Sequence, residues 1–150
     1  KAGAAASLAA CDGGARQLWR VPTGPLYSAL PGFCASSWVP AKVAAGPVRL
    51  RECRGGRATS WSVEPDGTLR SGGRCLALTF PAVAGAAVVV AKCDDRPAER
   101  WQVFGGPLAV EILSPQTGLC LAVPGDQVLA PSLALGYCTT TDPGATWRLS

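Results

Sequence analysis

The chain of 150 residues contains no histidine, no methionine and no asparagine. Without histidine it cannot build a Ser-His-Asp or Cys-His catalytic site, or a metal site with imidazole ligands. Without asparagine it has no acceptor for N-linked glycans. These absences exclude several common hydrolytic centres, and we expect neither a metal nor a cofactor.

Charged residues and long apolar runs are also scarce. Only 16% of the residues are charged, and the net charge of +4 is too small to argue for nucleic acid as a partner. The longest apolar run, residues 81–91, holds 11 residues, whereas crossing a bilayer needs about 20. We therefore expect no membrane span. Hydrophobic residues make up 48% of the chain, which is typical of a single globular domain of this length.

The seven cysteines never occur in C-x-x-C spacing. This pattern argues against zinc and thioredoxin-like chemistry and favours disulfides in an oxidising compartment. We therefore expect a secreted, extracellular or cell-surface protein.

A cysteine followed by a tryptophan recurs four times along the chain. The spacing is eight residues in three cases and nine in the last: Cys11 to Trp19, Cys53 to Trp61, Cys93 to Trp101, and Cys138 to Trp147. Three further cysteines precede the last three units by 19, 18 and 18 residues. Because internal repeats at a fixed period mark repeat architectures, the spacing predicts one local disulfide per repeat: Cys34–Cys53, Cys75–Cys93 and Cys120–Cys138.

Each repeat contains about four short strand-like segments separated by turn-forming residues. In the middle repeat the segments are 68–71, 74–80, 86–93 and 100–103. No segment has a helical period. We therefore predict an all-β barrel of about twelve short strands, closed by pseudo-threefold repetition over residues 20–63, 64–103 and 104–150. The equivalent core residues would be Trp61, Trp101 and Trp147.

The repeated order of cysteine, apolar strand, cysteine, polar turn and tryptophan resembles the ricin B-type lectins over residues 20–150. The resemblance implies a β-trefoil, carbohydrate binding, and a Q-x-W signature at each tryptophan. Here only Gln17 keeps the glutamine, because the other three units read TSW, ERW and ATW.

The resemblance also implies three sugar contacts per repeat. An aspartate is expected two residues after the first cysteine, but the chain has Ser36, Ala77 and Ala122. An aromatic ring is expected two residues before the second cysteine, but the chain has Arg51, Ala91 and Gly136. An asparagine is expected three residues before the tryptophan, but the chain has Ala58, Ala98 and Gly144. We therefore expect that the second and third repeats have lost this mode of sugar recognition.

The first repeat differs because it is rich in arginine. Arg49 and Arg51 share one strand face, which by resemblance is the ligand-binding face, while Glu52 reduces the positive charge. Guanidinium groups suit carboxylate, sulfate or phosphate, so the site residues we predict are Arg49, Arg51, Ser36 and Trp38. The alternative, which we favour for both features, is that the arginines form a solvated surface and that Trp38 is an extra core or barrel-end residue.

Residues 1–19 resemble the second half of a fourth repeat, completed by Trp19 as a further core residue. They form either a partial extra repeat or an N-terminal extension, and the chain would then be a piece of a longer protein. A competing interpretation is a lipoprotein cleavage box at Leu8 to Cys11, which the repeat spacing disfavours. In both cases Cys11 is unpaired within this chain.

Two functions remain open at this point. In the first, the domain binds a glycan as a targeting module of a larger protein, and its arginines favour an acidic glycan. In the second, it is a degenerate trefoil that contacts another protein or another domain of the same polypeptide. We do not expect an enzyme, because Asp94 and Asp95 are typical turn formers. Protease inhibition through an exposed loop is a third option that no residue singles out.

Overall fold

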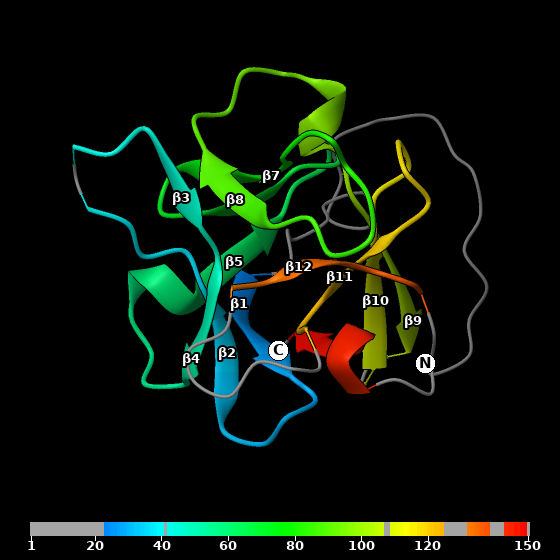
Figure 1. The fold of residues 1–150 in the computed structure, drawn as a ribbon. Coiled ribbons are helices and arrows are strands. Elements are labelled where there is room, and N and C mark those ends of the chain that lie inside the picture. Colours follow the sequence, from blue (N-terminus) through cyan, green and yellow to red (C-terminus); the bar gives the residue numbers. More distant parts are fainter. Residues whose placement is uncertain (1–22, 41, 107–108, 125–131, 139–142, 150) are drawn as a thin grey trace, which may run out of the picture.

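The computed structural model describes residues 23–40, 42–106, 109–124, 132–138 and 143–149. In this part the chain forms thirteen short strands and three single turns of 3-10 helix (Figure 1). The strands are β1 (Thr23–Ser28), β2 (Phe33–Ser36), β3 (Ala45–Pro47), β4 (Arg49–Glu52), β5 (Ser60–Val63), β6 (Leu69–Ser71), β7 (Arg74–Leu78), β8 (Val88–Ala91), β9 (Gln102–Gly106), β10 (Ala109–Leu113), β11 (Cys120–Ala122), β12 (Ala134–Gly136) and β13 (Trp147–Leu149). The 3-10 turns are η2 (Arg57–Thr59), η3 (Pro97–Glu99) and η4 (Pro143–Ala145).

All strand pairs are antiparallel, and the predicted all-β fold is confirmed. Each of the twelve expected segments contains a strand, and β3 is one strand more than expected. Val48 separates β3 from β4 because its backbone N–H turns away to the carbonyl of Val88 in another repeat. No helix among the described residues is long and apolar enough to cross a membrane.

Three buried residues join the three disulfide-containing repeats, which we call lobes one, two and three. The backbone N–H of Val48 donates to the carbonyl of Val88 (3.4 Å), Val88 donates to Leu133 (3.1 Å), and Leu133 donates back to Val48 (2.8 Å). Each residue lies five positions before the second cysteine of its lobe, and all three are fully buried. This cyclic set of bonds marks the pseudo-threefold axis.

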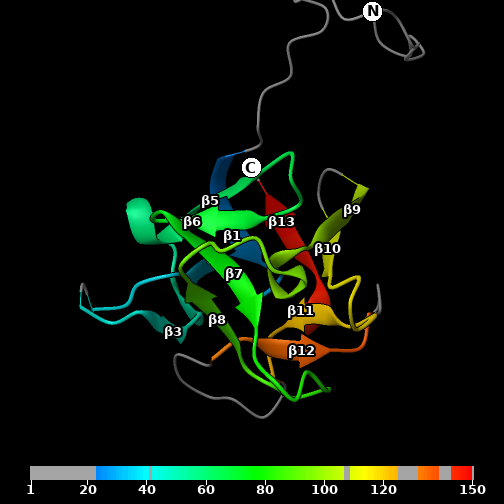
Figure 2. The same cartoon turned by 90° about the horizontal axis from the view of Figure 1, so that it is seen from above.

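The segments beside this ring close the molecule in the same cyclic order. β3 of lobe one pairs with β8 of lobe two, with Gly46 opposite Val90 (Figure 2). Ala87 of lobe two bridges to Ala134 of lobe three, and Ser132 of lobe three bridges back to Arg49 of lobe one. Each lobe therefore forms backbone pairs with both of the other lobes.

The core contains one tryptophan from each lobe, as predicted. Trp61, Trp101 and Trp147 are at most 4% exposed. Each donates its indole N–H to the carbonyl of the residue that follows the first cysteine of its lobe. These acceptors are Ala35 (3.0 Å), Leu76 (2.9 Å) and Leu121 (3.0 Å). The repeated bond satisfies the one polar atom of each buried ring and fixes it against the neighbouring strand.

The three predicted disulfides are confirmed, each within one lobe and each with a Cα–Cα distance of 5.1 Å. The expectations for residues 1–19, including an unpaired Cys11 and a core Trp19, concern residues outside those that the structure describes.

Candidate functional site

A groove of about 780 Å³ opens on lobe one, between the ends of β2 and β4 and the turn η2. Its lining combines two aromatic rings with polar and charged side chains. The residues that matter for its chemistry are Phe33, Ser36, Trp38, Arg51, Glu52 and Arg54. We call this the lobe-one groove.

The pairing of β2 with β4 decides which predicted residue enters the groove. Arg51 lies opposite Cys34, and Arg49 lies opposite Ser36. Arg51 is exposed and lines the groove, whereas Arg49 is half-buried and does not line it. Of the predicted pair of arginines, only Arg51 therefore lines the groove with Ser36 and Trp38, although Arg49 is the strand partner of Ser36.

Trp38 is 60% exposed and forms part of the groove wall. The interpretation of Trp38 as a core residue is therefore wrong. The reason is that β2 ends at Ser36, so strand alternation does not continue to Trp38. The backbone N–H of Trp38 donates instead to the Ser36 hydroxyl (3.3 Å), and Ser37 is bonded through its backbone N–H to the carbonyl of Ala58 (2.8 Å). These bonds hold the indole outside the barrel.

Phe33 supplies a second aromatic ring that the sequence did not single out. It is 39% exposed and lines the groove. Strand alternation groups Phe33 with Ala35, which is in the core, and this hides its role. Its position as the first residue of β2, opposite the charged Glu52, is the signal that places it at an open strand end.

The charges in the groove leave one guanidinium unmatched. Arg54 is held by the Glu52 carboxylate, with its Nε 2.9 Å from Oε2. Within the described part of the chain, the Arg51 side chain has no hydrogen bond and no ion pair. The groove therefore offers a free cation beside two aromatic rings, an arrangement suited to a ligand with an apolar face and a negative group.

The equivalent positions of lobes two and three carry neither an acceptor nor a ring. Ala77, Ala98 and Ala122 are at most 8% exposed. Gly136 lies so close to Ala122 that an added Cβ would approach its Cβ to 2.9 Å. A side chain therefore cannot be placed at Gly136 without displacing Ala122.

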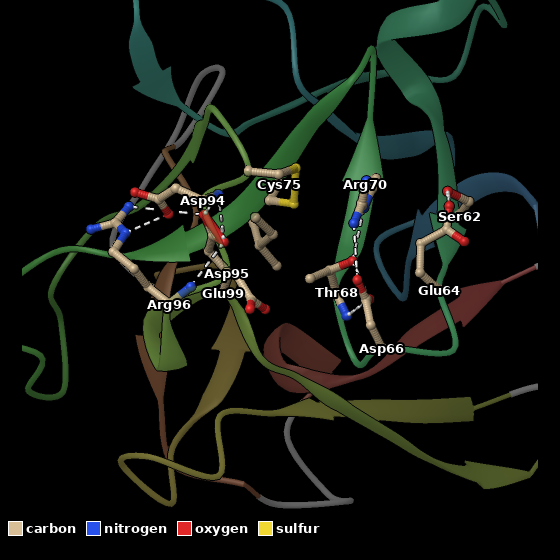
Figure 3. Close-up of a disulfide and its surroundings, with 12 residues drawn as sticks. Ser62, Glu64, Asp66, Thr68, Arg70, Cys75, Asp94, Asp95, Arg96 and Glu99 are labelled. Atoms are coloured by element: carbon tan, nitrogen blue, oxygen red, sulfur yellow. Dashed lines mark hydrogen bonds and ion pairs between the residues drawn. A yellow bond between two sulfur atoms is a disulfide. The ribbon is translucent and has the colours of Figure 1, made fainter.

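Lobe two carries charged groups in its turns, to either side of the Cys75 disulfide (Figure 3). Glu99, at the glutamine position of the Q-x-W signature, is fully buried and accepts the backbone N–H groups of Asp94 (2.9 Å) and Arg96 (3.4 Å). The Arg96 guanidinium, which donates to Asp94, lowers the pKa of Asp94. This network fixes the turn before Trp101, which is a structural role.

On the other side of the disulfide, Asp66 closes the turn between β5 and β6. Its carboxylate accepts the hydroxyl (2.6 Å) and the backbone N–H (2.9 Å) of Thr68, and it pairs with Arg70 (2.9 Å). These hydrogen bonds, led by that from the Thr68 hydroxyl, lower the pKa of Asp66. The hydrogen bonds of this carboxylate are therefore made within its own turn, which is a structural role.

One group of ligand-type atoms occurs in lobe three, where Glu111 approaches Cys120 and Cys138. The two sulfurs are bonded to each other in a disulfide, so they offer no thiolate to a metal. The group is therefore not a metal site in this form of the protein.

Comparison with known proteins assigns the chain to a family. The model of the ricin-type β-trefoil lectin domain matches residues 22–147. The chain belongs to this family. As a ricin-type lectin domain it contains, in lobe one, a groove at the position where the family resemblance implies a sugar site.

Two relatives are similar in sequence to parts of this chain. β-Galactoside-specific lectins 3 and 4 of Viscum album are 34% and 38% identical over 79 and 64 residues. These regions are 50% and 41% of this chain but only 13% and 12% of the two relatives, so the chain is similar to a small portion of each.

Solved structures show the same fold. The designed threefold-symmetric protein ThreeFoil has a TM-score of 0.73 and 17% identity, covering 85% of this chain and 97% of its own. The agglutinin of Abrus precatorius has a TM-score of 0.73 and 21% identity, covering 87% of this chain and 49% of its own. The predicted β-trefoil is therefore confirmed.

Proposed function

We propose that this domain binds carbohydrate through a single site, the lobe-one groove. The observation that carries the proposal is the juxtaposition of the exposed Trp38 ring with the unpaired Arg51 in a groove of about 780 Å³. Family membership supports carbohydrate as the ligand class. A solved relative from Momordica charantia, with 24% identity, is described in complex with α-methyl-D-galactoside.

The chemistry of the groove fits a sugar that carries a negative charge. The apolar face of a sugar ring stacks on an aromatic ring, and Trp38 and Phe33 supply such surfaces at exposures of 60% and 39%. Arg51 replaces the aromatic residue expected at its position and presents a planar fork of donors suited to carboxylate or sulfate. An acidic glycan is therefore the proposed ligand.

A binding experiment with matched aromatic variants tests the proposal. We expect Trp38→Ala to weaken binding to acidic glycans by at least about two- to tenfold, because one stacking contact contributes about 0.5 to 1.5 kcal/mol beyond its buried area. Arg51→Ala should weaken the binding of acidic glycans by a similar factor and leave the binding of neutral glycans little changed. Isothermal titration calorimetry, on the best ligands of a glycan array, measures both.

Tyr137→Ala is the matched control, because Tyr137 is 74% exposed in lobe three and lies outside the groove. It should bind as the parent does. Equal loss in the Trp38 and Tyr137 variants, or no change in either, contradicts a site in lobe one.

A second function is supported by lobes two and three. Their inherited sugar positions hold alanine and glycine, and lobe two exposes Phe80 (62%) and Val83 (57%) in the loop between β7 and β8. Exposed apolar side chains of this kind are used in contacts between proteins. A glycan array with no signal for neutral and acidic sugars alike would favour this structural or protein-interaction role.

The proposed setting is a secreted or cell-surface protein in which this domain directs a larger polypeptide to its target. Three disulfides fit an oxidising, extracellular location. The small share of the Viscum album lectins that the chain matches supports a module within a longer protein. The absence of catalytic activity stays a prediction.

A further inference from the structure

Two of the nine described arginines have no partner for their side chains, and both lie in the same segment of lobe one. Within the described residues, Arg51 and Arg57 make no side-chain hydrogen bond, ion pair or ring contact, and both are exposed. The other arginines are engaged with carboxylates, with a backbone carbonyl, with a tyrosine ring or in a further contact: Arg54, Arg70, Arg96, Arg100, Arg74, Arg148 and Arg49. Free guanidinium groups are thus concentrated beside the lobe-one groove.

Arg57 does not line the lobe-one groove but a second, smaller one of about 310 Å³. Both grooves are lined by residues of one short segment, 57–60. Ala58 and Thr59 line the first, whereas Arg57 and Ser60 line the second. The turn η2 is therefore the ridge between two adjacent grooves, each with one free arginine.

The second groove is otherwise lined by groups that bind hydroxyls. Ser60 and Ser62 come from β5, and Ser62 donates to the Glu64 carboxylate (3.1 Å), with Arg70 of β6 alongside (Figure 3). Arg70 is already engaged by Asp66 (2.9 Å), which leaves Arg57 as the free cation of this groove. Serine hydroxyls and a carboxylate fit the uncharged part of a saccharide.

We propose that the ligand is an anionic oligosaccharide that crosses the η2 ridge, with one negative group at Arg51 and a second at Arg57. This inference rests on the carbohydrate-binding function proposed above and extends that site into the second groove. Arg51 and Arg57 are six residues apart, so their Cα atoms are separated by no more than about 21 Å. We expect an oligosaccharide of several sugar units to span this distance.

The charge arrangement also sets the density of negative groups on the ligand. Each groove contains a glutamate, Glu52 in the first and Glu64 in the second. A densely charged polymer would bring its anions against these carboxylates, at a cost that neighbouring like charges impose. The structure fits an oligosaccharide with widely spaced negative groups better than a nucleic acid.

The test compares ligand lengths. The probes are a disaccharide and a hexasaccharide, each made in two series. The first series alternates uronic acid and N-acetylhexosamine and is unsulfated. The second replaces each uronic acid by a hexose that carries a single sulfate instead of the carboxylate. We expect the hexasaccharide of at least one series to bind about tenfold more tightly than its disaccharide. Arg57→Ala should remove this advantage and leave disaccharide binding unchanged, whereas Arg51→Ala should weaken both lengths.

Lys92→Ala is the matched control, because Lys92 is an exposed cation in lobe two and should leave all affinities unchanged. Thermal unfolding of each variant verifies folding. The inference is overturned if Arg57→Ala leaves hexasaccharide binding intact, if length has no effect, or if single-stranded DNA binds as tightly as the hexasaccharide. In those cases, glycan binding that is weakened by substitution of Trp38 still supports the proposed function. If no glycan of any kind binds, the proposed function itself fails.

Discussion

Trp38 and Trp101 show how one residue type takes two roles in this protein. Trp101 is 4% exposed and donates its indole N–H to a buried carbonyl, whereas Trp38 is 60% exposed in the wall of a groove. The first ring stabilises the fold, and the second is available to a ligand. Substitution should therefore separate stability from binding at these two positions.

We expect Trp101→Phe to lower the free energy of unfolding by about 1 to 3 kcal/mol, because it leaves the Leu76 carbonyl without its donor. The loss of ring volume adds to this cost. Trp38→Phe should change stability by less than about 0.5 kcal/mol, as is usual for an exposed site. Urea unfolding followed by far-ultraviolet circular dichroism measures both, and equal losses would contradict the assignment.

The difference between these residues also explains what the sequence could predict. Trp61, Trp101 and Trp147 recur eight or nine residues after a cysteine, the regular spacing of the cysteines predicts the disulfides, and the turn-forming residues between apolar segments predict about twelve strands. The groove has no such repeat, because it occurs in one lobe and depends on where β2 ends. Arg49 is predicted as a site residue because it shares with Arg51 the strand face that, by resemblance, binds ligand, and this does not reveal how far the groove extends along β4. Phe33 was missed for a related reason, since alternation assigns it to the core.

At the scale of elements, carboxylates form hydrogen bonds that hold two turns of lobe two. Asp66 closes the turn between β5 and β6 through Thr68, and Glu99 holds the turn before Trp101. Because hydrogen bonds that favour the ionised form of a carboxylate lower its pKa, the turn closed by Asp66 makes stability depend on pH.

The lowered pKa of Asp66 gives this dependence a sign. In the unfolded chain Asp66 has a pKa of about 3.9, so as the pH falls it binds a proton before the folded state does. The ionised Asp66 therefore contributes its full stabilisation of the fold above that pH. The contribution is lost as the pH falls through the lower pKa of the folded state. Since the side chain is 46% exposed, we expect it to amount to less than about 1 kcal/mol.

The measurement compares melting temperatures of the parent and Asp66→Ala from about pH 7 to about pH 2. The gap should be widest near neutral pH and should narrow below about pH 4. Asp66→Asn keeps an acceptor oxygen but cannot titrate, so it reports the charge alone. A gap that is constant over the whole range would show that the carboxylate does not contribute through its ionisation.

At the scale of the whole molecule, a ring of backbone hydrogen bonds joins the three lobes, and we expect them to unfold as one cooperative unit. Val48, Val88 and Leu133 each donate to the next around the pseudo-threefold axis. A defect at one of them therefore reaches all three lobes.

We expect Leu133→Ala to lower the free energy of unfolding by about 2 to 5 kcal/mol, the usual range for a buried leucine. Amide hydrogen exchange should show faster opening in all three lobes. Leu30→Ala, at a residue that is 39% exposed, serves as the control and should have little effect. Loss of protection confined to lobe three would contradict the ring as the source of cooperativity.

The bridge from Ser132 to Arg49 fastens the strand that carries Arg51 to the last lobe of the chain. On the ribosome, the groove residues of lobe one emerge before Ser132, which bridges to their strand. Domains fold as units during synthesis, so we expect that a nascent chain cannot capture ligand until lobe three has left the exit tunnel. Binding through the proposed site should therefore require that all three lobes have closed into the ring.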